Sequence, residues 1–127
     1  MFLGRVTDYT TVANTAVNFT TVKNSNNKIA NNSGVISFKK PGYYMLDVDL
    51  SVTGVAGEIT ATVFADGVAT PTTATTSLTA ATDYANLSIT DAITVAFSQF
   101  SDVATISVVI DTPGVVVDGT IRAFQLS

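Results

Sequence analysis

The residues whose type and spacing best suit catalysis are two aspartates, Asp47 and Asp49, in the stretch PGYYMLDVDLSVTG that begins at Pro41. On a β-strand, residues two positions apart point to the same face and lie about 6.6 Å apart. Glycoside hydrolysis uses a pair of carboxyl groups at about this separation. Asp47 and Asp49 are therefore a candidate catalytic pair of a carbohydrate-active enzyme. The alternative is that they line a solvated sheet face.

Other catalytic chemistry is restricted by composition, because the chain contains no histidine and no cysteine. This excludes histidine-containing triads, imidazole bases, thiolate metal sites and disulfides. Three further aspartates, Asp102, Asp111 and Asp118, fall near expected turns, and their oxygens could meet around a calcium ion. They could equally be solvated turn residues, since no Asp-x-Asp-x-Asp-Gly loop occurs. No cofactor is expected, and calcium binding remains open.

Charge and hydropathy limit the partners of the protein. The 127 residues carry a net charge of −4, which argues against binding to nucleic acid phosphates. No apolar run approaches the ~20 residues that span a bilayer, so no membrane partner is expected. Hydrophobic residues make up 46 % of the chain and charged residues only 13 %, about half the usual charged share. This composition favours an oligomer that buries part of its surface; the alternative is a monomer whose surface is solvated by Thr and Asn side chains.

The stretch around the two aspartates predicts a long central strand. Every second residue is apolar, and these residues should form its buried face: Tyr44, Leu46, Val48, Leu50 and Val52. Side chains on a strand alternate between faces with a period of two, whereas a helix would break this apolar stripe. Pro41-Gly42 supplies a turn before the strand, and Gly54 lies in the turn that follows it.

The rest of the chain predicts an all-β sandwich or barrel of eight to ten short strands, because no segment has a helical period. Asp66-Gly67 fits a tight hairpin turn, and Pro71 indicates an edge strand or a bulge. Asp91 is expected to mark a bend that divides residues 84–97 into two strands. The last segment, 115–126, has apolar residues in both phases and should be a strand buried on both sides. The other expected strands are 18–22, 28–30, 35–38, 58–65, 68–78 and 104–110.

Two short motifs resemble those of complement-1q-like domains. Gly42-Tyr43-Tyr44-Met45-Leu46 resembles the Gly-x-Tyr-x-Phe of that family's central strand, with leucine in place of phenylalanine, and Val117-Asp118-Gly119-Thr120-Ile121 resembles its Phe-x-Gly-x-Leu. The segment from Gly57 to Val95 is similar to a bacterial and phage branch that includes phage head fibres and the C-terminal domain of the exosporium collagen-like glycoprotein. The resemblance covers roughly residues 17–127, so residues 1–16 are expected to be a tether or an added strand.

The resemblance implies an antiparallel jelly-roll sandwich of about ten strands, of the TNF/complement-1q type, assembled as a homotrimer with one sheet around the three-fold axis. It also implies a non-enzymatic structural protein on a particle surface, most simply a phage virion. There it would serve as a head fibre, a decoration or an attachment module, with a host surface glycan or a capsid protein as partner. A spore-surface (exosporium) protein is the alternative, although the collagen-like Gly-x-y repeat is absent.

Aromatic residues are candidates for contacts with partners. Tyr9, Tyr43 and Tyr84 could stack on a sugar, because the face of an aromatic ring suits such a contact, or they could pack between subunits. The candidates for the trimer interface or for ligand contact are Tyr43, Met45, Tyr84 and Phe124.

Overall fold

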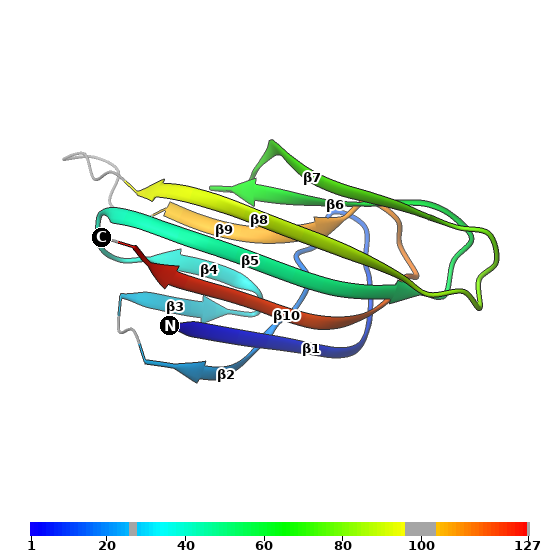
Figure 1. The fold of residues 1–127 in the computed structure, drawn as a ribbon, viewed down its shortest axis with the longest axis horizontal. Helices are drawn as coiled ribbons and strands as arrows, with labels where there is room; N and C mark the ends of the chain where they lie inside the picture. The colour runs from blue at the N-terminus through cyan, green and yellow to red at the C-terminus, as the bar shows by residue number, and fades with distance from the viewer. Residues whose placement is uncertain (26–27, 96–103, 127) are drawn as a thin grey trace.

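The computed structural model describes residues 1–25, 28–95 and 104–126, which form ten β-strands and no helix (Figure 1). The expected all-β, antiparallel sandwich of about ten strands is confirmed. Because these residues contain no helix, they include none that could span a membrane. The strands are β1 (Phe2–Thr10), β2 (Thr20–Asn24), β3 (Ile29–Asn32), β4 (Val35–Phe38), β5 (Gly42–Thr53), β6 (Gly57–Ala65), β7 (Val68–Leu78), β8 (Ala85–Val95), β9 (Ala104–Ile110) and β10 (Val116–Gln125).

The strands form two five-stranded sheets that pack face to face. One has the order β2-β1-β10-β5-β8 and is called the β5 sheet below, and the other has the order β3-β4-β9-β6-β7 and is called the β6 sheet. All pairings are antiparallel. Figure 1 shows the strands of the β5 sheet side by side, with both chain termini at the same end of the molecule.

Strand β5 is the longest strand among the described residues and lies inside its sheet, paired with β10 on one side and β8 on the other. Its alternating apolar residues are no more than 2 % exposed, as the sequence pattern predicts: Tyr44, Leu46, Val48, Leu50 and Val52. The alternate residues, including Asp47 and Asp49, point to the outer face, away from the β6 sheet. The period-two pattern therefore fixes which face of β5 is in the core.

The two sheets meet in a continuous apolar core. Tyr44 of β5 contacts Phe38 of β4 with ring centroids 4.7 Å apart, so this aromatic pair joins one sheet to the other. The Tyr44 hydroxyl donates a hydrogen bond of 2.8 Å to the carbonyl oxygen of Lys40. Burial raises the pKa of the Tyr44 phenol above its ordinary value of 10.0, because the low-dielectric core disfavours the phenolate.

Residues 2–10 form β1, which is paired on both sides, with β2 and with β10. Phe2 is fully buried and Val6 is 5 % exposed, so this strand contributes to the core. A bulge interrupts the pairing with β10 between Val6 and Tyr9, and within it Asp8 adopts a positive φ of 48°. The sequence pattern here is weak because the bulge breaks the period of two.

Two predictions from the sequence are confirmed: the hairpin turn at Asp66-Gly67, and the edge strand or bulge at Pro71. Asp66 and Gly67, with φ values of 52° and 80°, form the two-residue turn between β6 and β7, as expected for a hairpin in which both central residues need positive φ. Pro71 lies in β7, the edge strand of the β6 sheet, and the β6–β7 register shifts nearby. The missing N–H of Pro71 is tolerated because an edge strand needs partners on one side only.

Two strand predictions were wrong. Residues 84–97 were expected to be two strands with a bend at Asp91, but β8 runs unbroken from Ala85 to Val95 with Asp91 paired opposite Leu46. Residues 96 and 97 lie outside the described residues. The carboxylate of Asp91 is accommodated at the rim of the sandwich, where the Thr72 hydroxyl donates a hydrogen bond of 3.1 Å to it. The first expected strand, 18–22, begins instead at Thr20, because the pairing with β1 starts where Thr20 lies opposite Arg5.

The expected burial of the last strand on both sides does not occur within the single chain. Val117, Ile121 and Ala123 of β10 are fully buried against the β6 sheet. On the outer face, Asp118 is half-buried and Arg122 is exposed. The outward residues of β10 therefore lie on the surface of the single chain.

Candidate functional site

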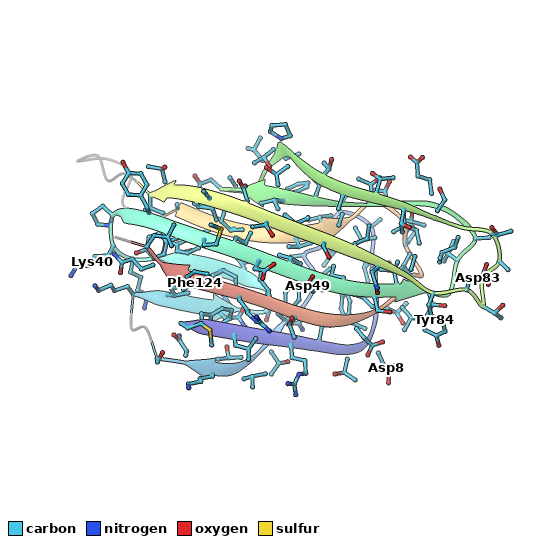
Figure 2. All side chains as sticks on the ribbon, in the orientation of Figure 1. Asp8, Lys40, Asp49, Asp83, Tyr84 and Phe124 are labelled. Atoms are coloured by element: carbon cyan, nitrogen blue, oxygen red, sulfur yellow. The ribbon has the colours of Figure 1, made fainter. Side chains whose placement is uncertain are left out.

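The outer face of the β5 sheet is polar at one end and apolar at the other. Asp49 of β5 pairs opposite Ser88 of β8 and opposite Thr120 of β10, so three polar side chains lie in one row across three strands. Further along the same face, Phe124 pairs opposite Met45. Figure 2 shows Asp49 between Phe124 at one end of the sheet and Tyr84 at the other.

The polar end contains a hollow of about 390 Å³, called the Gly119 hollow below. It is a concave surface because its lining residues are small or short. They come from β5, β8 and β10 and are Asp49, Leu50, Ser51, Asn86, Ser88, Asp118, Gly119 and Thr120. A Cβ at position 119 would lie 2.1 Å from the carbonyl oxygen of Asp49, so the backbone here accepts only glycine.

In each of the two carboxylates of the hollow, one oxygen accepts a hydrogen bond. The Ser88 hydroxyl donates to Asp49 Oδ1 at 2.9 Å, and the backbone N–H of Asp8 donates to Asp118 Oδ1 at 3.0 Å. The second bond arises from the β1 bulge, which removes the Asp8 N–H from the β-ladder. The Oδ2 atoms of Asp49 and Asp118 have no hydrogen-bond partner within the described residues, so they remain available as acceptors.

Tyr84 lies immediately before β8 and is 73 % exposed. It precedes the outward-facing residues Asn86 and Ser88 of that strand. Its backbone is held by the preceding turn, where the Thr53 hydroxyl donates to the carbonyl oxygen of Asp83 at 2.6 Å. Tyr84 is therefore an exposed aromatic residue at the start of β8, and it is not among the residues that line the hollow.

The opposite end of the face carries exposed apolar side chains, called the outer apolar patch below. Tyr43 is 58 % exposed and Phe124 36 % exposed. Leu126 is joined to Tyr43 by a backbone hydrogen bond of 2.7 Å, from the Leu126 N–H to the Tyr43 carbonyl oxygen. The pairing of Phe2 with Ala123 brings Met1 level with Phe124. The patch comprises Met1, Tyr43, Met45, Phe124 and Leu126.

The structure divides the four candidate contact residues into two groups. Tyr43, Met45 and Phe124 come together in the outer apolar patch, whereas Tyr84 lies at the far end of the sheet (Figure 2). Tyr9 is half-buried against the core, and its hydroxyl donates to the carbonyl oxygen of Ala16 at 3.4 Å.

The two candidate catalytic aspartates share the outer face of β5, but only Asp49 lines the hollow. Asp47 pairs opposite Arg122 and Thr90 instead. Sequence reasoning missed the contribution of Asn86, Ser88 and Asp118 to the hollow. The motif around Gly119 was the only available signal, because strand register is needed to bring β8 and β10 beside Asp49.

The possible calcium ligands do not converge in the part of the chain that the structure describes. Asp111, at the end of β9, accepts hydrogen bonds from the Thr60 N–H at 2.9 Å and the Thr112 hydroxyl at 3.1 Å, whereas Asp118 lies in the other sheet. Within the described ranges, no group of three or more acidic side chains could hold a metal ion. Asp102 lies outside them.

The fold is similar to solved jelly-roll structures. The globular domain of zebrafish complement 1qA protein has a TM-score of 0.75 and 12 % identity, over 99 % of this chain and 96 % of that chain. Eiger TNF from S. frugiperda has a TM-score of 0.68 and 13 % identity, over 99 % and 86 %. PRD1 vertex protein P5 has a TM-score of 0.61 and 15 % identity, over 99 % and 96 %.

These similarities define the class of protein as an all-β jelly roll of the TNF/complement-1q type, as the two sequence motifs imply. No protein-family model matches the chain, and no curated protein matches it. The similarity therefore concerns the fold, and a function has to be argued from the surface.

Proposed function

We propose that this protein is a non-enzymatic, homotrimeric structural protein on a particle surface, where it serves as a head fibre, decoration or attachment module. The observation that carries the proposal is the outer apolar patch on a jelly roll of the TNF/complement-1q type. Host surface glycans and capsid proteins are the partners that such a position offers. A phage virion is the particle that the sequence resemblance implies, and a spore surface is the alternative.

Self-association is supported by the chemistry of the patch. Exposed aromatic and methionine side chains are enriched in the cores of protein interfaces, and charged side chains are depleted there. Tyr43, Met45 and Phe124 match this composition, and the patch contains no charged side chain. Its proposed occupant is a second copy of the chain, with three copies closing around an axis as in the trimer that the resemblance implies.

A surface position is supported by PRD1 vertex protein P5, whose name places it at a vertex and whose fold this chain shares. Three identical copies on one axis would present three identical faces. Weak contacts with a repetitive surface would then act together, and avidity could exceed the affinity of each single contact by orders of magnitude.

The test is the mass in solution, measured by light scattering over a dilution series. The expected result is a species of three times 13.2 kDa, and Phe124→Asp should convert it to a monomer because a carboxylate would be buried in the interface. Ser77→Asp, on an exposed position of β7 in the other sheet, is the control and should leave the trimer intact. A wild-type monomer at every concentration would overturn the proposed assembly.

The second candidate is a carbohydrate-active enzyme that uses Asp47 and Asp49. It is favoured by one observation: both aspartates lie on the same outer face, and Asp49 borders a hollow. Release of reducing sugar from a polysaccharide by the wild type, abolished by Asp47→Asn, would establish this activity and remove the non-enzymatic proposal.

A further inference from the structure

We propose that the end of the sandwich that carries the lysines binds an anionic polysaccharide of a host surface, in which phosphate groups supply the charge. This inference rests on the proposed attachment function and deepens it, because it assigns the host contact to particular residues and to one chemical class. The residues are Lys28, Lys39 and Lys40, called the lysine cluster below.

The charges of the chain are segregated along the direction of the strands. All four lysines, at positions 23, 28, 39 and 40, lie at the end of the sandwich that holds both chain termini. Figure 2 shows Lys40 at this end, and Asp8 and Asp83 toward the other. Three further acidic residues lie toward the same end as Asp8 and Asp83: Glu58 in β6, Asp111 after β9 and Asp118 in β10.

The net charge of −4 therefore does not describe the lysine end. Strand β5 has twelve residues between the two ends, which is about 40 Å at about 3.3 Å per residue. Charges are largely screened beyond the Debye length of about 8 Å at physiological ionic strength. Among the described residues, Asp66 is the acidic residue in the turns at the lysine end, and it follows β6, two strands away from β4.

Hydrogen bonds hold the lysine cluster in place. The Lys39 N–H donates to the carbonyl oxygen of Lys28 at 2.7 Å, which continues the pairing of β3 with β4. The carbonyl oxygen of Lys40 accepts the 2.8 Å bond from the buried Tyr44 hydroxyl, and Lys28 Nζ donates to Gln125 Oε1 at 3.5 Å. This preorganisation reduces the entropy that binding must offset.

The amino groups of Lys28 and Lys40 lie close together although both are positive. The charge of Lys40, followed by desolvation, lowers the pKa of Lys28 below its ordinary value of 10.5. Within the described residues, no acidic side chain forms an ion pair with Lys39 or Lys40. Like charges held together are unfavourable, and such local conflicts are typical of functional sites. An anion bound between the amines would relieve this repulsion.

The type of cation favours phosphate over carboxylate. A lysine ammonium binds phosphate as a point charge, whereas the planar, bidentate recognition of a carboxylate is typical of arginine. The two arginines of the chain, Arg5 in β1 and Arg122 in β10, lie within strands of the β5 sheet and not in the turns at this end. The proposed position on a particle surface favours a polysaccharide over nucleic acid as the source of the phosphates.

The lysine cluster is compatible with the proposed trimer. Lys39 and Lys40 are exposed, and Lys28 is half-buried. Lys28 precedes β3 and Lys39 follows β4, and both strands belong to the β6 sheet. A trimer that packs through the outer face of the β5 sheet therefore leaves this end of the sandwich open, and it presents three lysine clusters to one repetitive polymer.

The experiment is a calorimetric titration of the full chain with a poly(glycerol phosphate) just long enough to contact one lysine cluster, at several concentrations of sodium chloride. The association constant should decrease with salt, with a slope of log K against log salt of about −2, since each of three neutralised phosphates contributes about −0.7. Dextran, a neutral polymer, should not bind.

The double variant Lys39→Gln, Lys40→Gln should bind about tenfold more weakly, or weaker still, at physiological ionic strength, and its slope should fall to about −0.7. It should remain folded because both side chains are exposed. Lys39→Arg, Lys40→Arg keeps the charge and should retain most of the affinity. Thr73→Glu, Ser77→Glu is the matched control, because it changes the net charge equally at exposed positions of β7, and it should bind like the wild type.

The short polymer separates this inference from the proposed assembly, because one lysine cluster suffices to bind it. A wild-type trimer that does not bind the polymer overturns this inference alone, and a wild-type monomer that binds it overturns the assembly alone. The lysine cluster is also excluded if the Thr73→Glu, Ser77→Glu control loses as much affinity as the Lys→Gln variant. Tighter binding to single-stranded DNA, or to vesicles of phosphatidylglycerol, would overturn the assignment to a polysaccharide.

Discussion

Tyr44 shows how one buried residue links the core to the pH dependence of stability. Its phenol is fully buried, and burial raises its pKa above the ordinary value. The folded protein therefore retains this proton to a higher pH than the unfolded chain does. Its contribution to the free energy of unfolding is fully present below pH 10 and is lost as the pH rises through the folded-state pKa.

We therefore expect the free energy of unfolding to decrease above about pH 10, measured by urea denaturation between pH 8 and pH 11 at fixed protein concentration. Tyr44→Phe should be about 1 kcal/mol less stable at pH 8, because it loses the hydrogen bond to the Lys40 carbonyl oxygen. Its stability should decrease less steeply above pH 10. Equal slopes in the two proteins would show that Tyr44 is not the group responsible.

Gly119 and Gly67 are matched positions for an alanine substitution, since both have positive φ. At Gly119 a Cβ would collide with the Asp49 carbonyl oxygen and lie 2.9 Å from the Leu50 Cα, whereas at Gly67 nothing lies within 4 Å. We expect Gly67→Ala to cost about 1 kcal/mol from backbone strain. Gly119→Ala should cost about 1–3 kcal/mol more from overpacking. Equal costs by chemical denaturation would contradict the close approach of β10 and β5.

Among the secondary-structure elements, strand β1 is an interior strand of the β5 sheet, because it lies between β2 and β10. We expect Phe2→Ala to lower the free energy of unfolding by about 3–5 kcal/mol, as for other buried aromatic residues. Thr7→Ala, at an exposed position of the same strand, should change it by less than about 0.5 kcal/mol.

Urea denaturation of these two variants tests whether the N-terminal residues form a structural strand of the domain or a tether. If Phe2→Ala were as stable as the wild type, residues 1–16 would behave as a tether that the rest of the domain does not need. Deletion of residues 1–10 should then also leave a folded protein, whereas a structural β1 predicts that this deletion prevents folding, since it removes one of the two strands that pair with β10.

At the scale of the whole molecule, the proposed trimer predicts a thermal stability that depends on protein concentration. Association with folded copies stabilises the folded state by mass action, so the Tm should rise when the concentration is raised a hundredfold. Phe124→Asp, which should be monomeric, is expected to show the same Tm at both concentrations by differential scanning calorimetry. A wild-type Tm that does not change with concentration would contradict the trimer.

The sequence by itself determined the parts of the protein that depend on neighbours along the chain. The period of two in residues 44–52 assigned the buried face of β5, and Asp66-Gly67 specified a hairpin turn, because side-chain alternation and turn conformation are local properties. The β1 strand was left undefined, since its bulge breaks the period. Asp91 was misassigned, because its hydrogen-bond partner, Thr72, is far away in sequence and in the other sheet.

Only the tertiary structure decided which surface residues act together. The pairing of β10 and β8 with β5 places Asn86, Ser88 and Asp118 around Asp49, although these residues are up to 69 positions apart in the sequence, from 49 to 118. The same register brings Phe124 beside Met45 and leaves Tyr84 at the opposite end. Strand register is set by the packing of whole sheets, so no local pattern could show that the outer face has one apolar end and one polar, hollow end.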